Sequence, residues 1–314
     1  MDRNDIDWRG YWPASPTPFR EDGAYDADAH RDLLEHYIAT GVHGVFVNGT
    51  TGEWFSQTGE ERRHVARTCI GAVAGRVPVV IGCTAYTATE VSALARDAMD
   101  AGASGVATTP PPYSRPLPDE IVAFFEDIAR ALPDVPVMVY NWPHGTSVDI
   151  DAPLAGRLAD VDTVVAIKDS TPNVEQFYVT ARTVVDRVRV IGPFMTREGH
   201  RALTEHGGDG TIGGGSLLGA DDPAFWDAHW RGDHETCLAL ADRIERLFAK
   251  LWLPGGWCGV YGHYQSQLKA LMAMLGQPGG TVRPPRLPVT DPAALAAMRQ
   301  ILAEEGLLSV QATA

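Results

Sequence analysis

Lysine is scarce in this chain, where Lys168, Lys250 and Lys269 are the only lysines among 26 basic residues. Acidic residues outnumber basic ones, and the formal net charge is −14. This acidic balance argues against nucleic acid and anionic membranes as partners, because both favour a basic surface. A small anionic substrate is compatible with it, since a few local donors outweigh a distant negative field.

Disulfide and metal-binding patterns are missing as well. The four cysteines, Cys69, Cys83, Cys237 and Cys258, include no CxxC pair, which is typical of reduced, buried thiols. The ten histidines form neither an HExxH motif nor a His/Cys cluster with zinc spacing. We therefore expect no metal and no other cofactor.

No apolar run approaches the ~20 residues of a membrane-spanning helix. The first residues, MDRNDIDWRG, lack the basic-then-apolar order of a signal peptide, so we expect a cytoplasmic protein. Hydrophobic residues make up 45% of the 314 positions, which is enough for a sizeable core.

Short β-rich runs alternate with amphipathic helical stretches through most of the sequence. The strand candidates are residues 11–19, 43–50, 77–84, 104–111, 135–141, 163–170, 188–194 and 210–215. They begin about every 22–34 residues, the spacing of βα units, and their apolar character is typical of a parallel sheet covered on both faces. Eight such units predict an α/β fold, a (β/α)8 TIM barrel. An open doubly wound sheet is the alternative, but no early strand is followed by the GxGxxG of a dinucleotide site.

Local signals mark the expected helix ends. One helix should begin near Thr58 and another near Thr87 and Thr89, because acidic residues follow these threonines. Three similar segments, ATGVHGV (39–45), DAGASGV (100–106) and EHGGDGT (205–211), carry two glycines three residues apart. The first glycine of each pair is expected to end a helix in the left-handed conformation.

Only helices are expected after residue 232, at 233–252, 262–275 and 291–306. The sequence therefore predicts a catalytic barrel at 1–232 and a C-terminal helical extension at 233–314. Residues 276–290 are rich in proline and glycine and predict a linker. The final SVQATA is expected to fray.

Lys168 lies at the end of a buried strand. In a barrel of this kind, catalytic side chains gather at the carboxyl ends of the strands. Arginine cannot serve as a nucleophile there because its guanidinium stays protonated. A desolvated lysine can lose its proton, and the neutral amine can form a Schiff base with a carbonyl. The alternative is a strand-end lysine paired with Asp169 at the surface.

Two neighbouring features favour the first interpretation. Tyr140 ends the preceding strand, so its phenol can converge on Lys168 and move protons. The GTTGE turn, with Gly49, Thr50 and Thr51, offers hydroxyls and backbone N–H groups for a carboxylate; a tight turn with a helix cap is the simpler alternative. Together these groups predict a small 2-oxo acid as substrate.

These motifs resemble the dihydrodipicolinate synthase / N-acetylneuraminate lyase family. The resemblance rests on PASPTPF (13–19), GTTGE (49–53), TPPPYSRP (109–116), YNWP (140–143), AIKDST (166–171) and GGDGTIGG (207–214). It implies a (β/α)8 barrel that forms homotetramers. It also implies that Lys168 is the Schiff-base lysine, that Tyr140 and Thr50 relay protons, and that Tyr113 completes this relay from a neighbouring subunit. Thr51 and the backbone near Ile212 would hold the 2-oxo acid.

The sequence also departs from the family pattern. Gly145 stands where the synthases carry an arginine that binds an acidic substrate, so authentic dihydrodipicolinate synthesis is not expected. Phe194 and His144 are expected at the pocket as further substrate-binding residues. Aromatic walls are expected from Trp54, Phe55, Tyr86, Trp142 and Trp257, which together suggest a less polar second substrate.

The leading functional hypothesis is a Schiff-base-forming lyase or aldolase that makes or breaks a C–C bond at pyruvate, with an aldehyde as the second substrate. A dehydratase or hydratase-aldolase acting on a 2-oxo acid of the keto-deoxy sugar acid type is the closest alternative. A non-catalytic barrel that binds a 2-oxo acid is a third.

Overall fold

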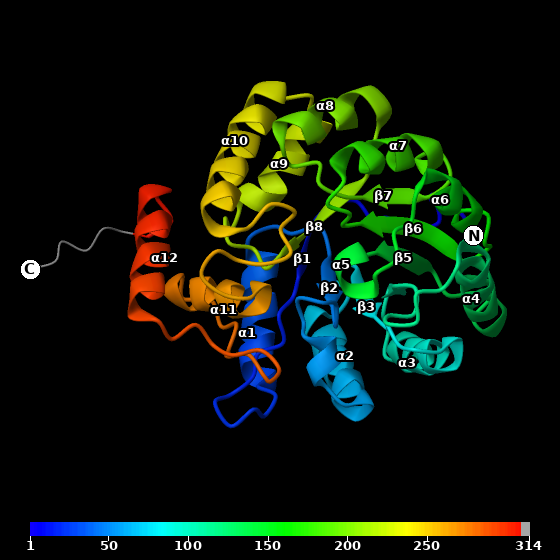
Figure 1. The fold of residues 1–314 in the computed structure, drawn as a ribbon, viewed down its shortest axis with the longest axis horizontal. Helices are drawn as coiled ribbons and strands as arrows, with labels where there is room; N and C mark the ends of the chain where they lie inside the picture. The colour runs from blue at the N-terminus through cyan, green and yellow to red at the C-terminus, as the bar shows by residue number, and fades with distance from the viewer. Residues whose placement is uncertain (309–314) are drawn as a thin grey trace, which may run out of the picture.

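The computed structural model describes residues 1–308, and eight parallel strands in it close into a single barrel (Figure 1). Each strand pairs with the next in sequence, and β1 pairs with β8. The strands are β1 Gly10–Ala14, β2 Val45–Val47, β3 Val79–Gly82, β4 Gly105–Thr108, β5 Val137–Asn141, β6 Val164–Asp169, β7 Arg189–Ile191 and β8 Gly210–Gly214. The predicted (β/α)8 barrel is confirmed, and the open doubly wound sheet is excluded.

Each strand is shorter than its predicted run, because the runs included residues of the adjoining loops. Seven strands lie within their runs, and β1 begins one residue earlier, at Gly10. The helices between strands are α1 Ala27–Ala39, α2 Gly59–Val73, α3 Ala88–Asp100, α4 Pro118–Ala131, α6 Ala152–Leu158, α7 Val174–Val184, α8 Arg197–His206 and α9 Asp221–Trp230. A short additional helix, α5 Pro143–Thr146, lies in the loop after β5. The barrel rim at the strand ends is therefore built from loops of unequal length.

The helix-end signals are found at the expected places. The hydroxyls of Thr58 and Thr87 accept hydrogen bonds from the first turns of α2 and α3, whereas Thr89 lies inside α3. Gly41, Gly102 and Gly207 have φ angles of +83°, +98° and +84°. A side chain at these positions would be strained, which explains the glycines that recur there.

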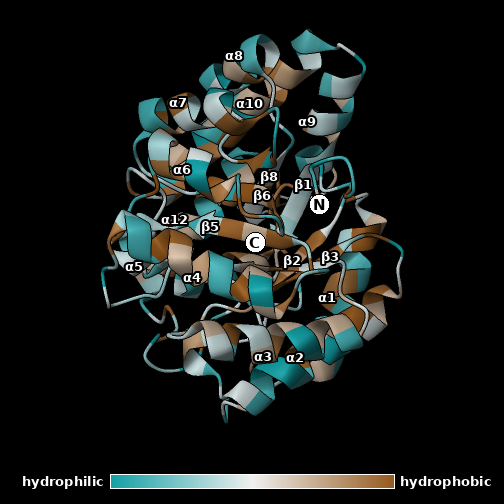
Figure 2. Ribbon diagram, turned by 90° about the vertical axis from the view of Figure 1, so that its right-hand side faces the viewer, coloured by the Kyte–Doolittle hydropathy of each residue, from teal (hydrophilic) through white to brown (hydrophobic). Residues whose placement is uncertain are grey.

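The barrel interior is filled by side chains from alternate strand positions. It contains Trp8, Trp12, Ala14, Phe46, Val80, Ala107, Met138, Val165, Ala166 and Ile191. Figure 2 shows the hydrophobic strands enclosed by helices whose outer faces are more hydrophilic. Because Lys168 lies two residues beyond Ala166, and Tyr140 two beyond Met138, both side chains continue the inner face toward the barrel mouth.

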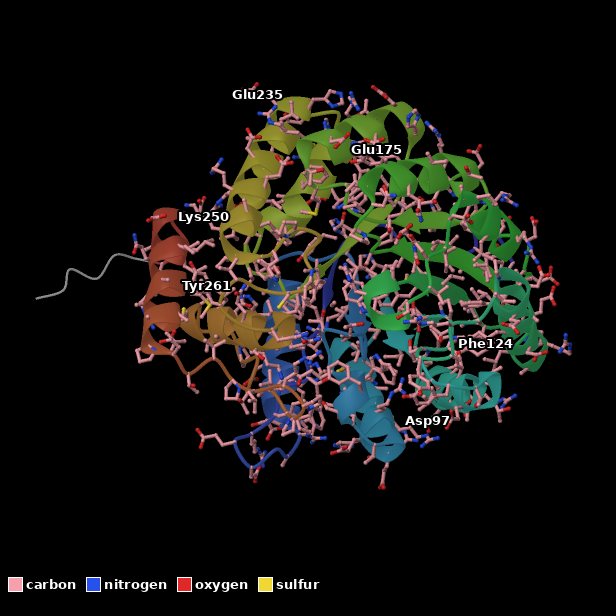
Figure 3. The ribbon with its side chains drawn as sticks, viewed as in Figure 1. Asp97, Phe124, Glu175, Glu235, Lys250 and Tyr261 are labelled. Atoms are coloured by element: carbon pink, nitrogen blue, oxygen red, sulfur yellow. The ribbon has the colours of Figure 1, made fainter. Side chains whose placement is uncertain are left out.

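Three helices follow the barrel: α10 His234–Leu251, α11 Tyr264–Met274 and α12 Pro292–Glu304. In Figure 1 they form the left side of the molecule, with α12 outermost. Lys250 of α10 pairs with Glu304 and Glu305 at 3.0 and 2.9 Å, beside α12 (Figure 3). No helix of residues 1–308 has both the length and the apolar character to cross a membrane. The SVQATA tail, expected to fray, lies outside the described residues.

Candidate active site

A cavity of about 810 Å³ opens at the carboxyl ends of the barrel strands. Most of the predicted site residues line it, namely Thr50, Thr51, Tyr113, Tyr140, His144, Lys168 and Ile212. They come from the ends of β5 and β6, from β8, and from loops after β2, β4 and β5. The closed barrel brings these distant segments together at one mouth, as expected for this fold.

Lys168 is held inside the cavity wall and is only 6% exposed. Its Nζ donates a hydrogen bond to the Ser170 hydroxyl at 2.7 Å and lies 3.7 Å from the centre of the Tyr140 ring. Burial lowers the pKa of Lys168 to about 7, although the nearby Asp169 charge opposes this shift. A neutral amine is therefore available near neutral pH.

Asp169 does not act as a surface partner for Lys168. Its Oδ1 accepts hydrogen bonds from the Asn141 side chain at 2.9 Å and the Thr171 backbone at 2.8 Å. The residue is 4% exposed, and burial raises its pKa to about 6. Within residues 1–308 no ion pair joins the two side chains, so the alternative of a surface Lys–Asp pair is wrong.

Tyr140 stands directly opposite Lys168 in the pairing of β5 with β6. Burial raises the pKa of its phenol to about 12, and hydrogen bonding with the hydroxyls of Thr50 and Ser170 moderates that rise. The ring also stacks on Trp142, with 6.3 Å between centroids. The phenol thus stays protonated at neutral pH and contacts groups that can pass a proton.

The GTTGE turn is fixed by buried polar contacts. Asn48 and Glu53 have left-handed backbone angles of +56° and +55°, and the Thr17 hydroxyl donates to the Gly52 carbonyl at 2.7 Å. A three-residue 3₁₀ helix, Trp54–Ser56, follows the turn, and α2 begins only at Gly59. The long helix thus begins after Thr58, as the sequence predicted, and the 3₁₀ helix separates it from the turn.

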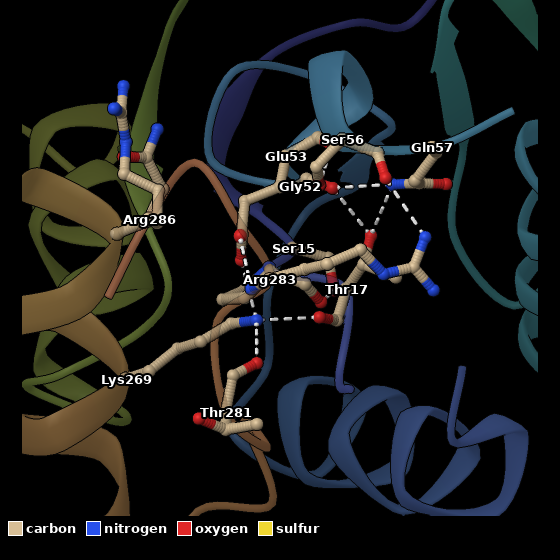
Figure 4. A network of polar contacts seen from close by, with 12 residues as sticks. Ser15, Thr17, Gly52, Glu53, Ser56, Gln57, Lys269, Thr281, Arg283 and Arg286 are labelled. Carbon is tan, nitrogen blue, oxygen red and sulfur yellow. Dashed lines mark hydrogen bonds and ion pairs between the residues drawn. The ribbon is translucent and has the colours of Figure 1, made fainter. Parts of the chain in front are cut away.

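Lys269 of α11 fastens this turn to the C-terminal extension, a role that its sequence context did not reveal. Its Nζ pairs with Glu53 at 2.6 Å and donates to the carbonyls of Thr17 and Thr281 at 2.7 and 2.6 Å (Figure 4). Lys269 and Glu53 are 3% and 0% exposed, and burial lowers the pKa of Lys269. The pair is a buried connection between α11 and the loop that carries Thr50 and Thr51.

The start of α11 also reaches the cavity. The Tyr264 hydroxyl lies so close to Gly214 that a Cβ there would approach it to 1.6 Å. Burial raises the pKa of Tyr264 to about 12, and a hydrogen bond with Thr51 opposes the rise. Gln265 donates from Nε2 to the Thr50 carbonyl at 2.9 Å. These residues were missed because 262–275 carries only the pattern of an amphipathic helix.

Comparison with known proteins shows the family of the chain. The Dihydrodipicolinate synthetase family profile matches residues 7–304. The chain belongs to the dihydrodipicolinate synthetase family. It is 32% identical over 288 residues to an uncharacterized DapA-like lyase of Rhizobium meliloti, covering 91% of this chain and 92% of that protein. It is 36% identical over 247 residues to 4-hydroxy-tetrahydrodipicolinate synthase of Phenylobacterium zucineum, covering 78% and 82% of the two chains.

Solved structures of the family share the fold. YagE, a prophage protein from E. coli whose structure holds pyruvate, superposes with a TM-score of 0.85 at 27% identity, covering 96% of this chain and 99% of YagE. Dihydrodipicolinate synthase from Aquifex aeolicus also gives a TM-score of 0.85 at 25% identity, with coverage of 96% and 99%. The resemblance inferred from the motifs is therefore confirmed at the level of the family.

The family's arginine position is filled differently in this member. A Cβ at Gly145 would approach the Trp142 ring to 2.2 Å, so the indole occupies the space beside this glycine. The His144 ring lies 5.6 Å from that of Trp142 and is stacked 5.6 Å from that of Trp257. The other predicted aromatic residues, Trp54, Phe55 and Tyr86, also line the cavity. Aromatic side chains from several loops thus contribute to the cavity lining.

Two predicted binding residues need correction. Phe194 is fully buried, and its ring packs against Phe177 and Trp226 at 5.2 and 6.0 Å; it follows β7 but points into the layer between barrel and helices. Gly49 does not line the cavity either, because it packs against the Phe46 ring, where a Cβ would meet a ring carbon at 2.4 Å. After β7 the cavity is lined by Pro193, Met195 and Thr196 instead.

Tyr113 borders the cavity but is 91% exposed, with a left-handed φ of +72°. Among residues 1–308, no group of three or more His, Cys, Asp or Glu side chains is placed to hold a metal ion. The amine, carboxyl and guanidinium side chains of the cavity lining are those of Lys168, Asp169, Glu245 and Arg286.

Proposed function

We propose that this chain is a Schiff-base-forming lyase that makes or breaks a C–C bond at pyruvate or a related 2-oxo acid, with an aldehyde as the other substrate. The observation that carries the proposal is the burial of Lys168 against Tyr140, with the lysine pKa lowered to about 7. The relative described as a DapA-like lyase and the pyruvate complex of YagE support the same class.

In the proposed reaction the neutral amine of Lys168 attacks the ketone carbon, and loss of water from the carbinolamine gives a protonated imine. The imine accepts the electron pair of the breaking C–C bond, so an enamine and an aldehyde form. Tyr140, in contact with Thr50, supplies and removes the protons of these steps. Return of a proton to the enamine carbon and addition of water then release pyruvate and the free lysine. The reverse sequence forms the bond.

Binding of the 2-oxo acid is assigned to the same cluster. Thr51 and the backbone at Ile212 would hold its carboxylate, and Tyr113 would complete the proton relay from a neighbouring subunit of a homotetramer. The exposure of Tyr113 at the cavity edge leaves it available for such a contact. A lysine that can become neutral and a phenol beside it are more than a binding barrel needs, which favours an enzyme over a sensor.

We further propose that this enzyme is not an authentic dihydrodipicolinate synthase. Gly145 supplies no side chain for an acidic substrate, and Trp142 fills the adjoining space. The aromatic side chains of the lining favour an aldehyde with an aromatic or apolar body. A dehydratase or hydratase-aldolase on the same 2-oxo acids would use Lys168 in the same way, so product identity separates these alternatives.

Borohydride reduction in the presence of pyruvate, followed by peptide mass spectrometry, tests the first step. We expect a reduced pyruvyl adduct on Lys168 and none on Lys250 or Lys269. Product analysis with a panel of aldehydes then distinguishes C–C bond formation from dehydration. An unmodified Lys168 under conditions that leave the protein folded would overturn the proposed function.

A further inference from the structure

Arg286 is a cation in the cavity lining that the chemistry at Lys168 leaves unused. It belongs to the Pro/Gly-rich segment 276–290, which was expected to be only a linker. Its Nε donates to the Gln265 side-chain oxygen at 3.0 Å, and burial lowers its pKa. Among residues 1–308 no carboxylate forms an ion pair with its guanidinium, and its two terminal nitrogens form no hydrogen bond.

The neighbouring Arg283 shows what a structural arginine in this segment looks like. Its guanidinium donates to the backbone carbonyls of Gly23 and Ser56 and pairs with Glu61 at 2.9 Å. In Figure 4, Arg286 lies to one side of the network that joins Glu53 to Lys269. One arginine of the segment therefore holds the fold together. The other lines the cavity with two terminal nitrogens that have no hydrogen-bond partner among residues 1–308.

The position of Arg286 is fixed relative to the reacting groups through Gln265. One end of the Gln265 amide accepts from Arg286, and the other donates to the Thr50 carbonyl at 2.9 Å. His263 also lies 2.9 Å from the same Gln265 oxygen, through its Nδ1. Because Thr50 in turn contacts Tyr140, a short chain of contacts leads from the guanidinium to the phenol beside Lys168.

The immediate surroundings of Arg286 are aromatic. Its guanidinium carbon lies 5.1 Å from the centre of the Phe55 ring, and Trp54 and Tyr113 line the same cavity. The Glu53 carboxylate is near enough to raise the pKa of Arg286, but it pairs with Lys269. A partly desolvated guanidinium that lies along an aromatic face and has no ion-pair partner among residues 1–308 is well suited to bind a carboxylate. Glu245, the other carboxylate of the lining besides Asp169, accepts from the Arg197 backbone.

We propose that Arg286, held by Gln265, binds an acidic group of the second substrate, so that the preferred acceptor is an aromatic aldehyde carrying a carboxylate. This inference rests on the proposed function and names the substrate class of the same site. The aldehyde carbon would face the enamine on Lys168, while the carboxylate would reach the guanidinium at the outer part of the mouth. The arginine that the loop after β5 lacks would thus be replaced by one from the C-terminal extension.

The test compares 4-formylbenzoate with 4-formylbenzamide, which differ in charge but hardly in shape, as acceptors for pyruvate. We expect the wild-type enzyme to favour the carboxylate by about 10–100-fold in kcat/KM, the range of one charge-assisted contact. Arg286→Met keeps the stem that packs on Phe55 and should abolish this preference. Arg286→Lys should retain part of it. The KM for pyruvate and the borohydride adduct on Lys168 should stay unchanged in both variants.

Binding of benzoate and benzamide, followed by the fluorescence of the cavity tryptophans, tests the inference without turnover. Tighter binding of benzoate that Arg286→Met removes supports it, whether or not either aldehyde reacts. Equal binding of benzoate and benzamide would overturn the inference. A raised KM for pyruvate in Arg286→Met would also overturn it, because that result would mean that Arg286 binds the carboxylate of pyruvate. If no pyruvate adduct forms on Lys168, only the proposed function is overturned. The benzoate measurement does not depend on the imine, so it still tests the role of Arg286.

Discussion

The Nζ of Lys168 lies 3.7 Å from the centre of the Tyr140 ring, and the two residues are directly opposed across β5 and β6. The ring covers the amine on one side and excludes water from it. The electron-rich face of the ring also attracts the protonated form, so the lowered pKa shows that desolvation outweighs this attraction.

Lys168→Arg should abolish both the pyruvate adduct and turnover, because a guanidinium cannot become a neutral nucleophile. We expect kcat to fall by at least about a thousandfold. The thermal unfolding temperature should fall moderately while the protein stays folded, because arginine keeps a buried charge that the lysine can lose. Lys250→Arg is the matched control, since that lysine lies on α10 and pairs with Glu304 and Glu305. Normal turnover in Lys168→Arg would rule out the lysine mechanism.

Imine formation should depend on pH through the ionisation of Lys168. Its pKa is lowered to about 7, so the neutral amine predominates above that pH and decreases roughly tenfold per unit below it. The rate of adduct formation with pyruvate should therefore rise up to about pH 7 and then level off.

Asp169→Asn sharpens this pH measurement. The Asp169 charge raises the pKa of Lys168, and asparagine keeps the Oδ1 acceptor used by Asn141 and Thr171. The inflection of the rate profile should move to lower pH in this variant. A shift to higher pH would contradict the assigned electrostatics.

Tyr140→Phe should separate binding from proton transfer. The phenyl ring still covers Lys168, so the pyruvate adduct should form, while turnover falls by about 10²–10⁴-fold, the usual contribution of a general acid–base group. Tyr261→Phe is the control, because Tyr261 is half-buried beside α11 and does not line the cavity. Equal turnover in the two variants would remove Tyr140 from the proton relay.

Lys269→Met should destabilise the protein by about 3–5 kcal/mol, because it leaves the Glu53 carboxylate buried without its cation. The double variant Glu53→Gln/Lys269→Met removes both charges and should recover much of that loss. Urea unfolding measures both values. Additive losses in the double variant would show that the two residues do not stabilise each other.

Tyr113 can be tested by subunit mixing. If it acts in a neighbouring subunit's site, Lys168→Arg and Tyr113→Phe tetramers that are dissociated and reassembled together should regain activity, to about a quarter of wild type for random exchange. Before mixing, the Lys168→Arg tetramer should be inactive and the Tyr113→Phe tetramer weakly active. No recovery after proven exchange would place Tyr113 in its own subunit's site, or outside the reaction.

Lys168, Tyr140 and the Thr50–Thr51 pair were predictable because each lies at or just after the end of a strand. In a parallel barrel all strand ends meet at one mouth, so a position along the strand is enough to place the side chain. Phe194 shows the limit of this argument. It follows β7 in the same way, yet the chain turns at Gly192 and Pro193 and directs its ring between Phe177 and Trp226.

The contributions of the C-terminal extension could not be predicted. Gln265 and Thr50 are 215 residues apart in the sequence, and Lys269 looks like an ordinary polar position of an amphipathic helix. No periodicity specifies which loop such a helix packs against. The 276–290 segment reads as a linker because proline and glycine exclude regular structure, although the polar contacts of Arg283 fix it against the barrel.

The sequence alone determined the closed parallel barrel and the lysine–tyrosine pair at its mouth. The pattern of a strand and the position of its end are local properties of the sequence, and the repeated βα units bring all strand ends to the same end of the barrel. Only the tertiary structure decided that α11 and the segment after it complete the cavity with Tyr264, Gln265 and Arg286. The position of these residues depends on long-range packing and on the buried Glu53–Lys269 ion pair. The two charges stabilise each other only after folding has brought them together away from water.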